Sequence, residues 1–319
     1  MSTPPVRNPL PRYPTGWFAV AFSRDVAPGE LRALHYFGRE LVLYRGQSGR
    51  AVLMDAYCPH LGAHMGHGGT IEGDEIRCPF HHWRFGPDGA CTAIPWADRP
   101  MKVDVGTFPV VERNGVICTW HDAAGGPPSW QPATHKLPAG PAIGAHFFMD
   151  DVVVHAQEVM ENNTDFRHLE SVHSFGPWSH ESLEADGATL RLRGHGSAGD
   201  LTYSGETTLH GPGYLEGVSR IGPAPFSVQL LLYVTPVDDR LCHVRCTYDV
   251  LPDPGVPLDP AMAGQIAEQG CRETERQFHL DRLIWAHKMY VERPPLSTVD
   301  GPIRQFRAWY SQFYPAAAG

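Results

Sequence analysis

The chain has 319 residues, 42% hydrophobic and 19% charged, which is the balance of a globular protein long enough for two domains. The formal net charge of -9 argues against binding to nucleic acid or to an anionic membrane surface. No apolar run is long enough to predict a membrane span, and the first residues lack the apolar centre of a signal peptide. Five of the seven cysteines, those outside the motif described below, show no spacing typical of a disulfide framework, so we expect a cytoplasmic protein.

The first part of the chain predicts β structure. Residues 1–15 are rich in proline and predict an extended arm. Over residues 16–120, short apolar runs alternate with Gly, Pro, Asp and Asn turns, which predicts an all-β domain. Residues 121–141, rich in Gly, Pro and Ala, predict a linker, so that a second domain would occupy residues 142–319. The predicted strands include Trp17–Phe22, Glu40–Tyr44, Ala51–Asp55 and Gly115–Trp120.

Two short motifs lie inside this β domain. Cys58 and His60 form the first, and Cys78 and His81 form the second, 17 residues after His60. Two cysteines on one iron and two histidines on the other are the ligands of a Rieske [2Fe–2S] cluster. A zinc site is the alternative, although zinc sites more often pair Cys with Cys and His with His. The segment from Cys58 to Cys91 closely resembles the cluster-binding segment of Rieske oxygenases.

Three further histidines lie in the same segment but away from the motif positions. We expect His64, His67 and His82 to be polar loop residues rather than ligands. One of them departs from the family that the segment resembles, because that family often has glycine after the fourth cluster ligand, where this chain has His82. We expect the cluster to tolerate this change.

The second domain is predicted to contain both helices and strands. Met149–Thr164 leads into a short helix, and Thr189–Val250 alternates as strands, among them Val228–Thr235 and Cys242–Val250. One long helix is predicted from Pro260 to about Tyr290. The chain has no phosphate-binding glycine loop, so nicotinamide or flavin chemistry is expected on another protein.

A second constellation follows the short helix. Asp165 and His168 are three residues apart, so a helix would place both on one face. His173 is five residues beyond His168, so the helix must break or widen before it. Two histidines and one carboxylate are the ligands of non-haem Fe(II) oxygenases, although such a pair alone could be accidental. The pattern resembles the mononuclear-iron motif of Rieske oxygenases, which implies that His168 and His173 bind Fe(II) and that Asp165 bridges the two metal sites.

The third iron ligand must be a carboxylate. Asp281, on the long helix, has apolar neighbours at Phe278, Ile284 and Trp285, and a buried acid is costly unless it is paired or binds metal. An ion pair with Arg245 is the alternative to a metal. The segment QFHLDRLIW around Asp281 also resembles the carboxylate-ligand helix of these oxygenases.

The resemblance extends over nearly the whole chain. The tail over residues 300–314 is similar to that of the 3-ketosteroid 9α-hydroxylase and cholesterol 7-desaturase branch. This branch implies an α+β protein in which an all-β Rieske domain precedes a helix-grip (START-like) domain with an antiparallel sheet and a long C-terminal helix. It also implies the oxygenase component of a multicomponent monooxygenase, which uses O2 and electrons from a separate ferredoxin or NAD(P)H-dependent ferredoxin reductase.

The resemblance further implies a bulky apolar, steroid-like substrate that is hydroxylated, demethylated or desaturated. It implies a homotrimer in which head-to-tail packing brings the cluster of one subunit beside the iron of the next. Two alternatives stay open: a Rieske electron carrier or ligand-binding protein without oxygenase activity, and an oxygenase of a non-steroid natural product or aromatic. The apolar strand segment 221–234 suits a substrate pocket or an ordinary core equally.

Overall fold

The structure is a computed structural model that describes residues 8–135, 144–198 and 200–315. These residues form two compact units: residues 17–134 make the first, and residues 8–16 together with 135–315 make the second. Residues 8–15 of the predicted arm are therefore part of the second unit, where the Thr15 amide donates to the Phe313 carbonyl at 2.7 Å. No helix of the described residues is both long and apolar enough to cross a membrane.

The first unit extends further than the predicted β domain. The indole N–H of Trp17 donates to the Trp130 carbonyl at 2.8 Å, and the ring of Trp130 packs edge-on against Trp120 with centroids 4.6 Å apart. These contacts bring residues 121–134, which the sequence predicts to be linker, into the first unit. The predicted linker residues 136–141 lie outside the described residues.

The first unit consists of three small sheets, and its single short helix is η1 (Ser23–Asp25) among the described residues. One sheet has the order β1 (Gly16–Phe22), β11 (Val116–His121), β10 (Val110–Arg113). The second has the order β2 (Leu31–Tyr36), β3 (Arg39–Arg45), β4 (Ala51–Asp55), β9 (Thr107–Phe108). The third has the order β5 (Thr70–Glu72), β6 (Glu75–Arg77), β7 (Arg84–Phe85), β8 (Cys91–Ala93). Cys58 and Cys78 belong to the same buried core as Tyr44, Met54 and Phe85.

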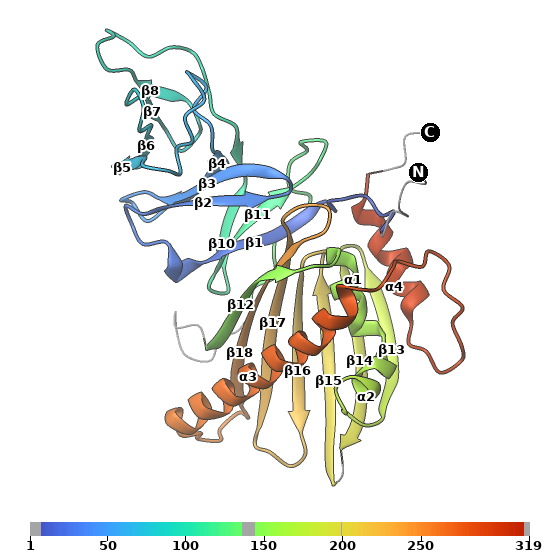
Figure 1. The fold of residues 1–319 in the computed structure, drawn as a ribbon. Coiled ribbons are helices and arrows are strands. Elements are labelled where there is room, and N and C mark those ends of the chain that lie inside the picture. Colours follow the sequence, from blue (N-terminus) through green and yellow to red (C-terminus); the bar gives the residue numbers. More distant parts are fainter. Residues whose placement is uncertain (1–7, 136–143, 199, 316–319) are drawn as a thin grey trace. The chain divides into compact units, whose positions relative to one another are not determined.

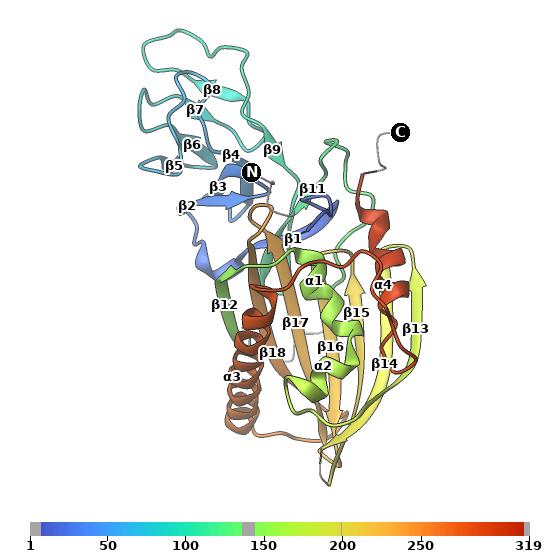
Figure 2. The ribbon, with the colours of Figure 1, turned by 45° about the vertical axis from the view of Figure 1, so that its right-hand side comes forward.

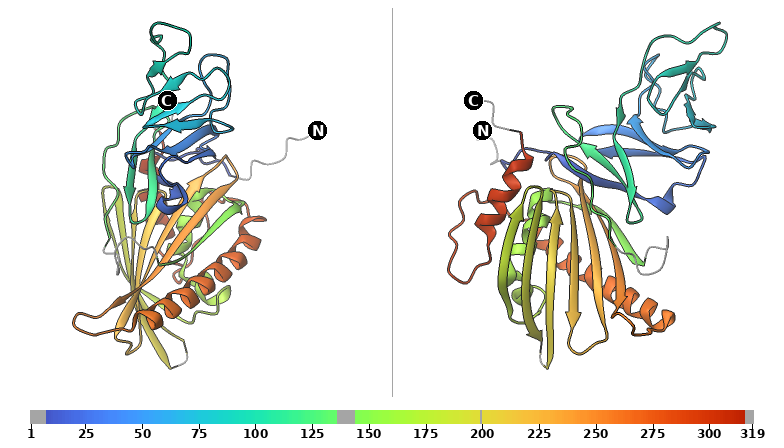
Figure 3. Two further views of the ribbon diagram at one scale, coloured as in Figure 1. Left: turned by 90° about the vertical axis from the view of Figure 1, so that its left-hand side faces the viewer. Right: turned by 180° about the vertical axis from the view of Figure 1, so that it is seen from behind.

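The second unit is built on a seven-stranded antiparallel sheet. Its order is β12 (Ala145–Val152), β18 (Cys242–Pro252), β17 (Phe226–Pro236), β16 (Tyr214–Ile221), β15 (Leu201–His210), β14 (Thr189–Ala198), β13 (Trp178–Asp186). The helices are α1 (Ala156–Glu161), η2 (Asn162–Thr164), α2 (Phe166–Ser171), α3 (Pro260–Trp285), α4 (Ile303–Tyr310) and η3 (Ser311–Phe313). Helix α3 lies across one face of the sheet (Figure 1), and α1 and α2 lie over the same face (Figure 2). The opposite face is seen from behind in Figure 3.

Helix α3 begins where the sequence predicts and ends earlier. The side chain of Asp259 accepts a hydrogen bond from the Met262 amide at 2.9 Å, and Pro260 occupies the first turn, which together fix the start. The predicted end at Tyr290 is wrong, because the helix ends at Trp285. The chain leaves the helical path after this point, and the Lys288 ammonium pairs with Glu158 at 2.9 Å.

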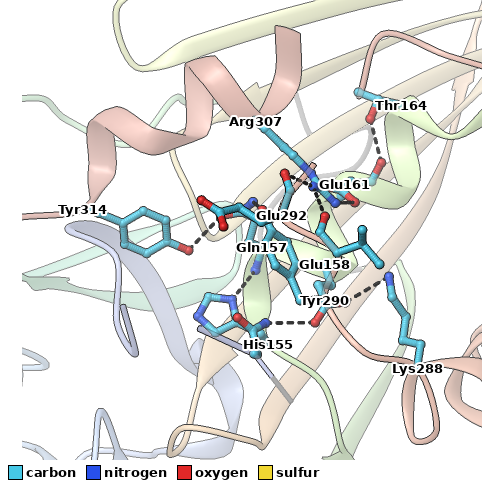
Figure 4. A network of polar contacts seen from close by, with 12 residues as sticks. His155, Gln157, Glu158, Glu161, Thr164, Lys288, Tyr290, Glu292, Arg307 and Tyr314 are labelled. Carbon is cyan, nitrogen blue, oxygen red and sulfur yellow. Dashed lines mark hydrogen bonds and ion pairs between the residues drawn. The ribbon is translucent and has the colours of Figure 1, made fainter. Parts of the chain in front are cut away.

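A buried polar network ties α1 to the C-terminal residues (Figure 4). The Arg307 guanidinium donates two hydrogen bonds to the Glu161 carboxylate, at 2.6 and 2.8 Å. The Tyr314 hydroxyl donates to the Gln157 side chain at 2.9 Å. All six residues of α1 are buried, so these polar groups need partners inside the protein. The network therefore fixes the helix that leads directly into the Asn162–Asp165 segment.

We expect Arg307→Ala to lower the free energy of unfolding of the second unit by about 3–5 kcal/mol, because it leaves the Glu161 carboxylate buried without its partner. The side chains of the pair are only 16% and 10% exposed, so solvent replaces little of the lost interaction. Urea unfolding followed by circular dichroism measures the change. Arg304→Ala, on the exposed side of the same helix, is the control, and the double variant Glu161→Gln/Arg307→Ala should recover part of the loss. Equal effects of Arg304→Ala and Arg307→Ala would contradict the assignment.

Candidate metal centres

The first unit brings the two cysteines and two histidines of the motifs together. Cys58 and Cys78 are each 2% exposed and their thiols are hydrogen-bonded to each other. The rings of His60 and His81 lie with centroids 4.7 Å apart, and His60 stacks on Trp83 at 4.3 Å. The Nδ1 atom of His60 is buried and has no hydrogen-bond partner among the described residues. An orphaned imidazole nitrogen beside paired thiols is the arrangement that a metal cluster would complete.

The electrostatics of the thiols support this fit. Burial, with smaller contributions from Cys78 and Cys91, raises the pKa of Cys58 to about 11. At neutral pH the thiol is therefore protonated unless a cation stabilises the thiolate. A bound metal supplies that positive charge and replaces the proton.

The two cysteine loops share one backbone design. The Gly62 amide donates to the Cys58 carbonyl at 2.9 Å, and the His82 amide donates to the Cys78 carbonyl at 3.2 Å. Both donors have left-handed backbone conformations, with φ of +75° for Gly62 and +60° for His82. This explains why glycine suits the position after the fourth ligand, and histidine is among the residues that adopt this conformation at moderate cost.

We expect His82→Gly to keep the visible spectrum of the cluster and to change stability by no more than about 1 kcal/mol, because relief of left-handed strain is offset by backbone entropy. We expect His82→Val to be destabilising, since a β-branched residue tolerates positive φ poorly. The temperature at which visible circular dichroism is lost reports both effects. Loss of the spectrum in His82→Gly would show that the imidazole itself is needed.

Two other histidines of this segment have contacts of their own. The Nδ1 atom of His64 accepts a hydrogen bond from the Gly66 amide at 3.1 Å, and its Nε2 lies 3.6 Å from the Glu40 carboxylate. The ring of His67 packs against His64 with centroids 4.5 Å apart. These contacts lie within the first unit, and the interpretation of His64 and His67 as polar loop residues stays a prediction.

The second unit brings His168, His173 and Asp281 together. Helix α2 ends at Ser171, so His173 lies beyond the helix, as the five-residue spacing requires. The two imidazole rings are 5.0 Å apart, and His173 Nε2 lies 3.3 Å from Asp281 Oδ1. One ligand atom from each of the three residues lies within 4.8 Å of the others. Arg245, the alternative partner of Asp281, instead holds its guanidinium over the ring of Phe148 at 4.4 Å.

Two neighbours orient these side chains. The Nδ1–H group of His168 donates to the backbone carbonyl of Asp165, which leaves Nε2 of His168 for a metal. The sequence predicts Asp165 and His168 on one face of a helix, but Asp165 precedes α2 instead of lying within it. The side chain of Asn162, which the sequence analysis did not single out, hydrogen-bonds Asp281.

Burial disfavours the charged forms of the side chains in this triad. It raises the pKa of Asp281 and lowers the pKa of His173, and the two residues are only 7% and 9% exposed. A buried carboxylate beside two imidazoles is costly in its charged form without a cation. The donor set and its burial therefore fit a divalent metal ion.

A cavity of about 340 Å³ opens beside this triad. Helix α3 contributes Thr274, Gln277 and Phe278 to its wall. Apolar residues of the sheet and of α1–α2 provide much of the remaining surface: Val159, Phe166, Leu169, Leu192, Leu215, Ile221, Val228, Leu230 and Leu232. The apolar strand segment 221–234 thus lines a pocket. The volume and lining are those of a site for an apolar small molecule.

The first unit is all-β and contains the two cysteines and two histidines of the motifs. In the second unit, a sheet packs against a helix beside two histidines and an aspartate. Together these features define the class of Rieske non-haem iron oxygenases. The chain belongs to this family. Residues 16–109 match the Rieske [2Fe-2S] domain, and residues 119–314 match the 3-ketosteroid 9alpha-hydroxylase C-terminal domain.

Similar proteins agree with this assignment. The chain is 32% identical to a cholesterol 7-desaturase of Bombyx mori, over 95% of this chain and 70% of that protein. It is 31% identical to a probable 3-ketosteroid-9-alpha-monooxygenase, oxygenase component, of Rhodococcus rhodochrous, over 97% of this chain and 82% of that protein. The fold is shared with apo dicamba monooxygenase, at a TM-score of 0.69 and 18% identity, over 93% of this chain and 96% of that one.

These findings confirm the fold class, the oxygenase activity and the cofactors that the sequence predicts. The chain is an oxidoreductase whose cofactors are a Rieske [2Fe–2S] cluster and mononuclear non-haem iron. As an oxygenase component, it receives its electrons from a separate protein.

Proposed function

We propose that this oxygenase hydroxylates, demethylates or desaturates a bulky apolar substrate of the steroid class. The observation that carries the proposal is the apolar cavity that opens directly on the buried His–His–Asp triad. The proposed cluster ligands are Cys58, His60, Cys78 and His81. The proposed Fe(II) ligands are His168, His173 and Asp281.

Bound iron supplies the oxygen chemistry, and the residues of the chain supply its geometry. The Asp165 carbonyl fixes the tautomer of His168, so that the same imidazole nitrogen always faces the metal. Asn162 restrains the Asp281 carboxylate. The apolar wall excludes water and holds the substrate beside the triad, which limits side reactions and orients the carbon that reacts.

The proposal is tested by assaying the reconstituted protein for product formation with a partner reductase, NAD(P)H and O2. We expect a 3-ketosteroid or a sterol to give an oxidised product in step with O2 consumption, and a single-ring aromatic to give little product. Acid-labile sulfide together with cluster iron and mononuclear iron is expected in each chain. Cluster iron without mononuclear iron would favour a Rieske electron carrier, and zinc without acid-labile sulfide would favour a zinc protein. Product from the single-ring aromatic, with none from the steroids, would favour an oxygenase of non-steroid substrates.

Small residues on β15 and β16 form part of the cavity wall: Gly205, Thr207, Gly217 and Ser219. A Cβ atom on Gly217 would meet Leu230 and Thr207 only at 3.9 Å, so the backbone accepts a side chain there. A long side chain at this position would project into the cavity.

We expect Gly217→Leu to lower kcat/KM for a steroid by roughly 10- to 100-fold, since overfilling a packed site costs about 1–3 kcal/mol. Gly217→Ala, which adds only the tolerated Cβ, is the matched control and should stay within a few-fold of the natural protein. Steady-state kinetics and iron content measure the effect. Unchanged kinetics in Gly217→Leu would place the substrate elsewhere.

We also propose a homotrimer with head-to-tail contacts. Apolar side chains flank the cluster loops, where Tyr57, Leu61 and Phe80 are 53%, 65% and 59% exposed. Others lie just beyond Asp281 on α3, where Leu283 and Ile284 are 68% and 47% exposed. A contact between these two different surfaces of neighbouring copies would bury both, and such heterologous contacts close naturally into a ring.

The electron donor is proposed to be a ferredoxin or an NAD(P)H-dependent ferredoxin reductase, acting in the cytoplasm. The absence of disulfides supports this location, because all seven cysteines lie among the described residues and are free thiols. Purification of the natural protein with its bound reductase, or reduction of the cluster by candidate donors, tests this assignment.

A further inference from the structure

A second group of metal-type side chains lies on the opposite face of the sheet from the cavity. Leu215 and Gly217 line the cavity, so Glu216 between them points to the other face, which Figure 3 shows from behind. His210, at the end of β15, and His135 join Glu216 there. One ligand atom from each of these three residues lies within 4.8 Å of the others, as is also true of the proposed Fe(II) triad.

The contacts within this group are compatible with a bound cation. The Nδ1 atom of His135 lies 3.0 Å from Glu216 Oε1. Nitrogen and oxygen lone pairs approach this closely only when a proton or a metal ion lies between them. The Nε2 atom of His210 is buried and has no hydrogen-bond partner among the residues that the structure describes. A buried imidazole nitrogen without a partner is costly unless it has a ligand.

The charge states suit a metal. Burial lowers the pKa of His210 to about 4, so that the ring is neutral at pH 7 and keeps its lone pair. Burial acts to raise the pKa of Glu216, but its contacts with His135 and Gln229 outweigh this, and the net effect is a lowered pKa. Two imidazoles and one carboxylate match the donor set of known zinc sites.

Neighbouring residues would orient these ligands. The other ring nitrogen of His135, Nε2, contacts the Tyr214 hydroxyl, which is the support that metal-bound histidines usually have. The Gln229 amide donates to Glu216 at 2.5 Å. The ring of Tyr214 stacks on His210 with centroids 5.0 Å apart.

We propose that His135, His210 and Glu216 form a binding site for a divalent transition-metal ion of the zinc type, separate from the cluster and from the catalytic iron. The bound ion would fasten residue 135 to the ends of β15 and β16. Its role is structural, because the site faces away from the substrate cavity.

The test uses protein loaded with cluster and Fe(II), exposed to micromolar Zn²⁺ and then desalted. We expect one additional zinc per chain with no loss of iron, and a rise in the thermal midpoint of unfolding. His210→Ala and Glu216→Gln should each weaken zinc binding by roughly 10- to 100-fold and remove the thermal shift. Glu216→Gln keeps the size and hydrogen bonding of the side chain, and an unchanged cluster spectrum reports folding. His195→Ala, an exposed histidine on β14, is the control and should bind zinc normally.

X-ray absorption at the zinc edge should show only nitrogen and oxygen ligands, including two imidazoles. Four results would overturn the proposal. The first two are the absence of retained zinc, which would leave a proton between His135 and Glu216, and equal zinc binding by the variants and the natural protein. The other two are sulfur ligands, which would place zinc at the cysteines, and zinc gained only as iron is lost, which would place it in the proposed Fe(II) triad.

Discussion

Replacing His168 or His173 with alanine is expected to abolish turnover and to empty the proposed Fe(II) site while the visible spectrum of the cluster stays unchanged. Loss of a residue that only supports a metal ligand typically lowers the affinity for the metal about 10- to 100-fold. Loss of one of three protein ligands should lower the affinity for iron by at least this factor. The proposed cluster ligands belong to the first unit and the His168–His173–Asp281 triad to the second, so the cluster should assemble normally. Asp281→Ala should lower both iron content and turnover. Metal analysis, visible absorbance and product formation measure these effects.

The matched control for these variants is His279→Ala. His279 lies on α3 two residues before Asp281, is exposed, and contacts Arg282 at 3.2 Å. It should retain iron and activity. Turnover at the natural rate in Asp281→Ala would mean that another carboxylate completes the site, and loss of the cluster spectrum in His168→Ala would mean that the two metal sites assemble together.

The features that local sequence determines were predictable. The five-residue spacing between His168 and His173 requires a helix break, and α2 does end between them. The Asp259-Pro260 pair marks the start of α3 because a cap and a proline in the first turn are local signals. The alternation of apolar residues likewise predicted the strands, whose observed ends differ by one or two residues.

Features that depend on contacts between distant residues were not predictable. Residues 121–134 look like a linker by composition, and contacts with distant residues, such as those of Trp130 with Trp17 and Trp120, bring them into the first unit. The place of Gly217 in the cavity wall depends on strand register, which sets it opposite Thr207. The role of the Asp165 carbonyl is invisible in the sequence, because every residue has one.

Asp165→Asn is expected to keep both metals and the proposed trimer yet to lose almost all electron transfer from reduced cluster to iron. The structure explains why the iron site should persist in this variant. His168 donates to the backbone carbonyl of Asp165, which asparagine retains, so the iron site should persist. We expect the Asp165 carboxylate to bridge the two metal sites by accepting a hydrogen bond from His81 of a neighbouring copy. An amide of the same size removes the negative charge that would couple that imidazole to the iron site.

Single-turnover oxidation of pre-reduced protein, with substrate and O2, isolates this step from the reductase. We expect the rate in Asp165→Asn to fall on the order of 100-fold or more, as for loss of a buried charged hydrogen bond between subunits. Glu170→Gln makes the same change from carboxylate to amide on α2, at a residue that pairs with Arg167 at 2.7 Å, and should react at the natural rate. Because electron transfer is proposed to run between subunits, the rate should also depend on the trimer. Natural rates in Asp165→Asn, or a fully active monomer by light scattering, would exclude the route through Asp165.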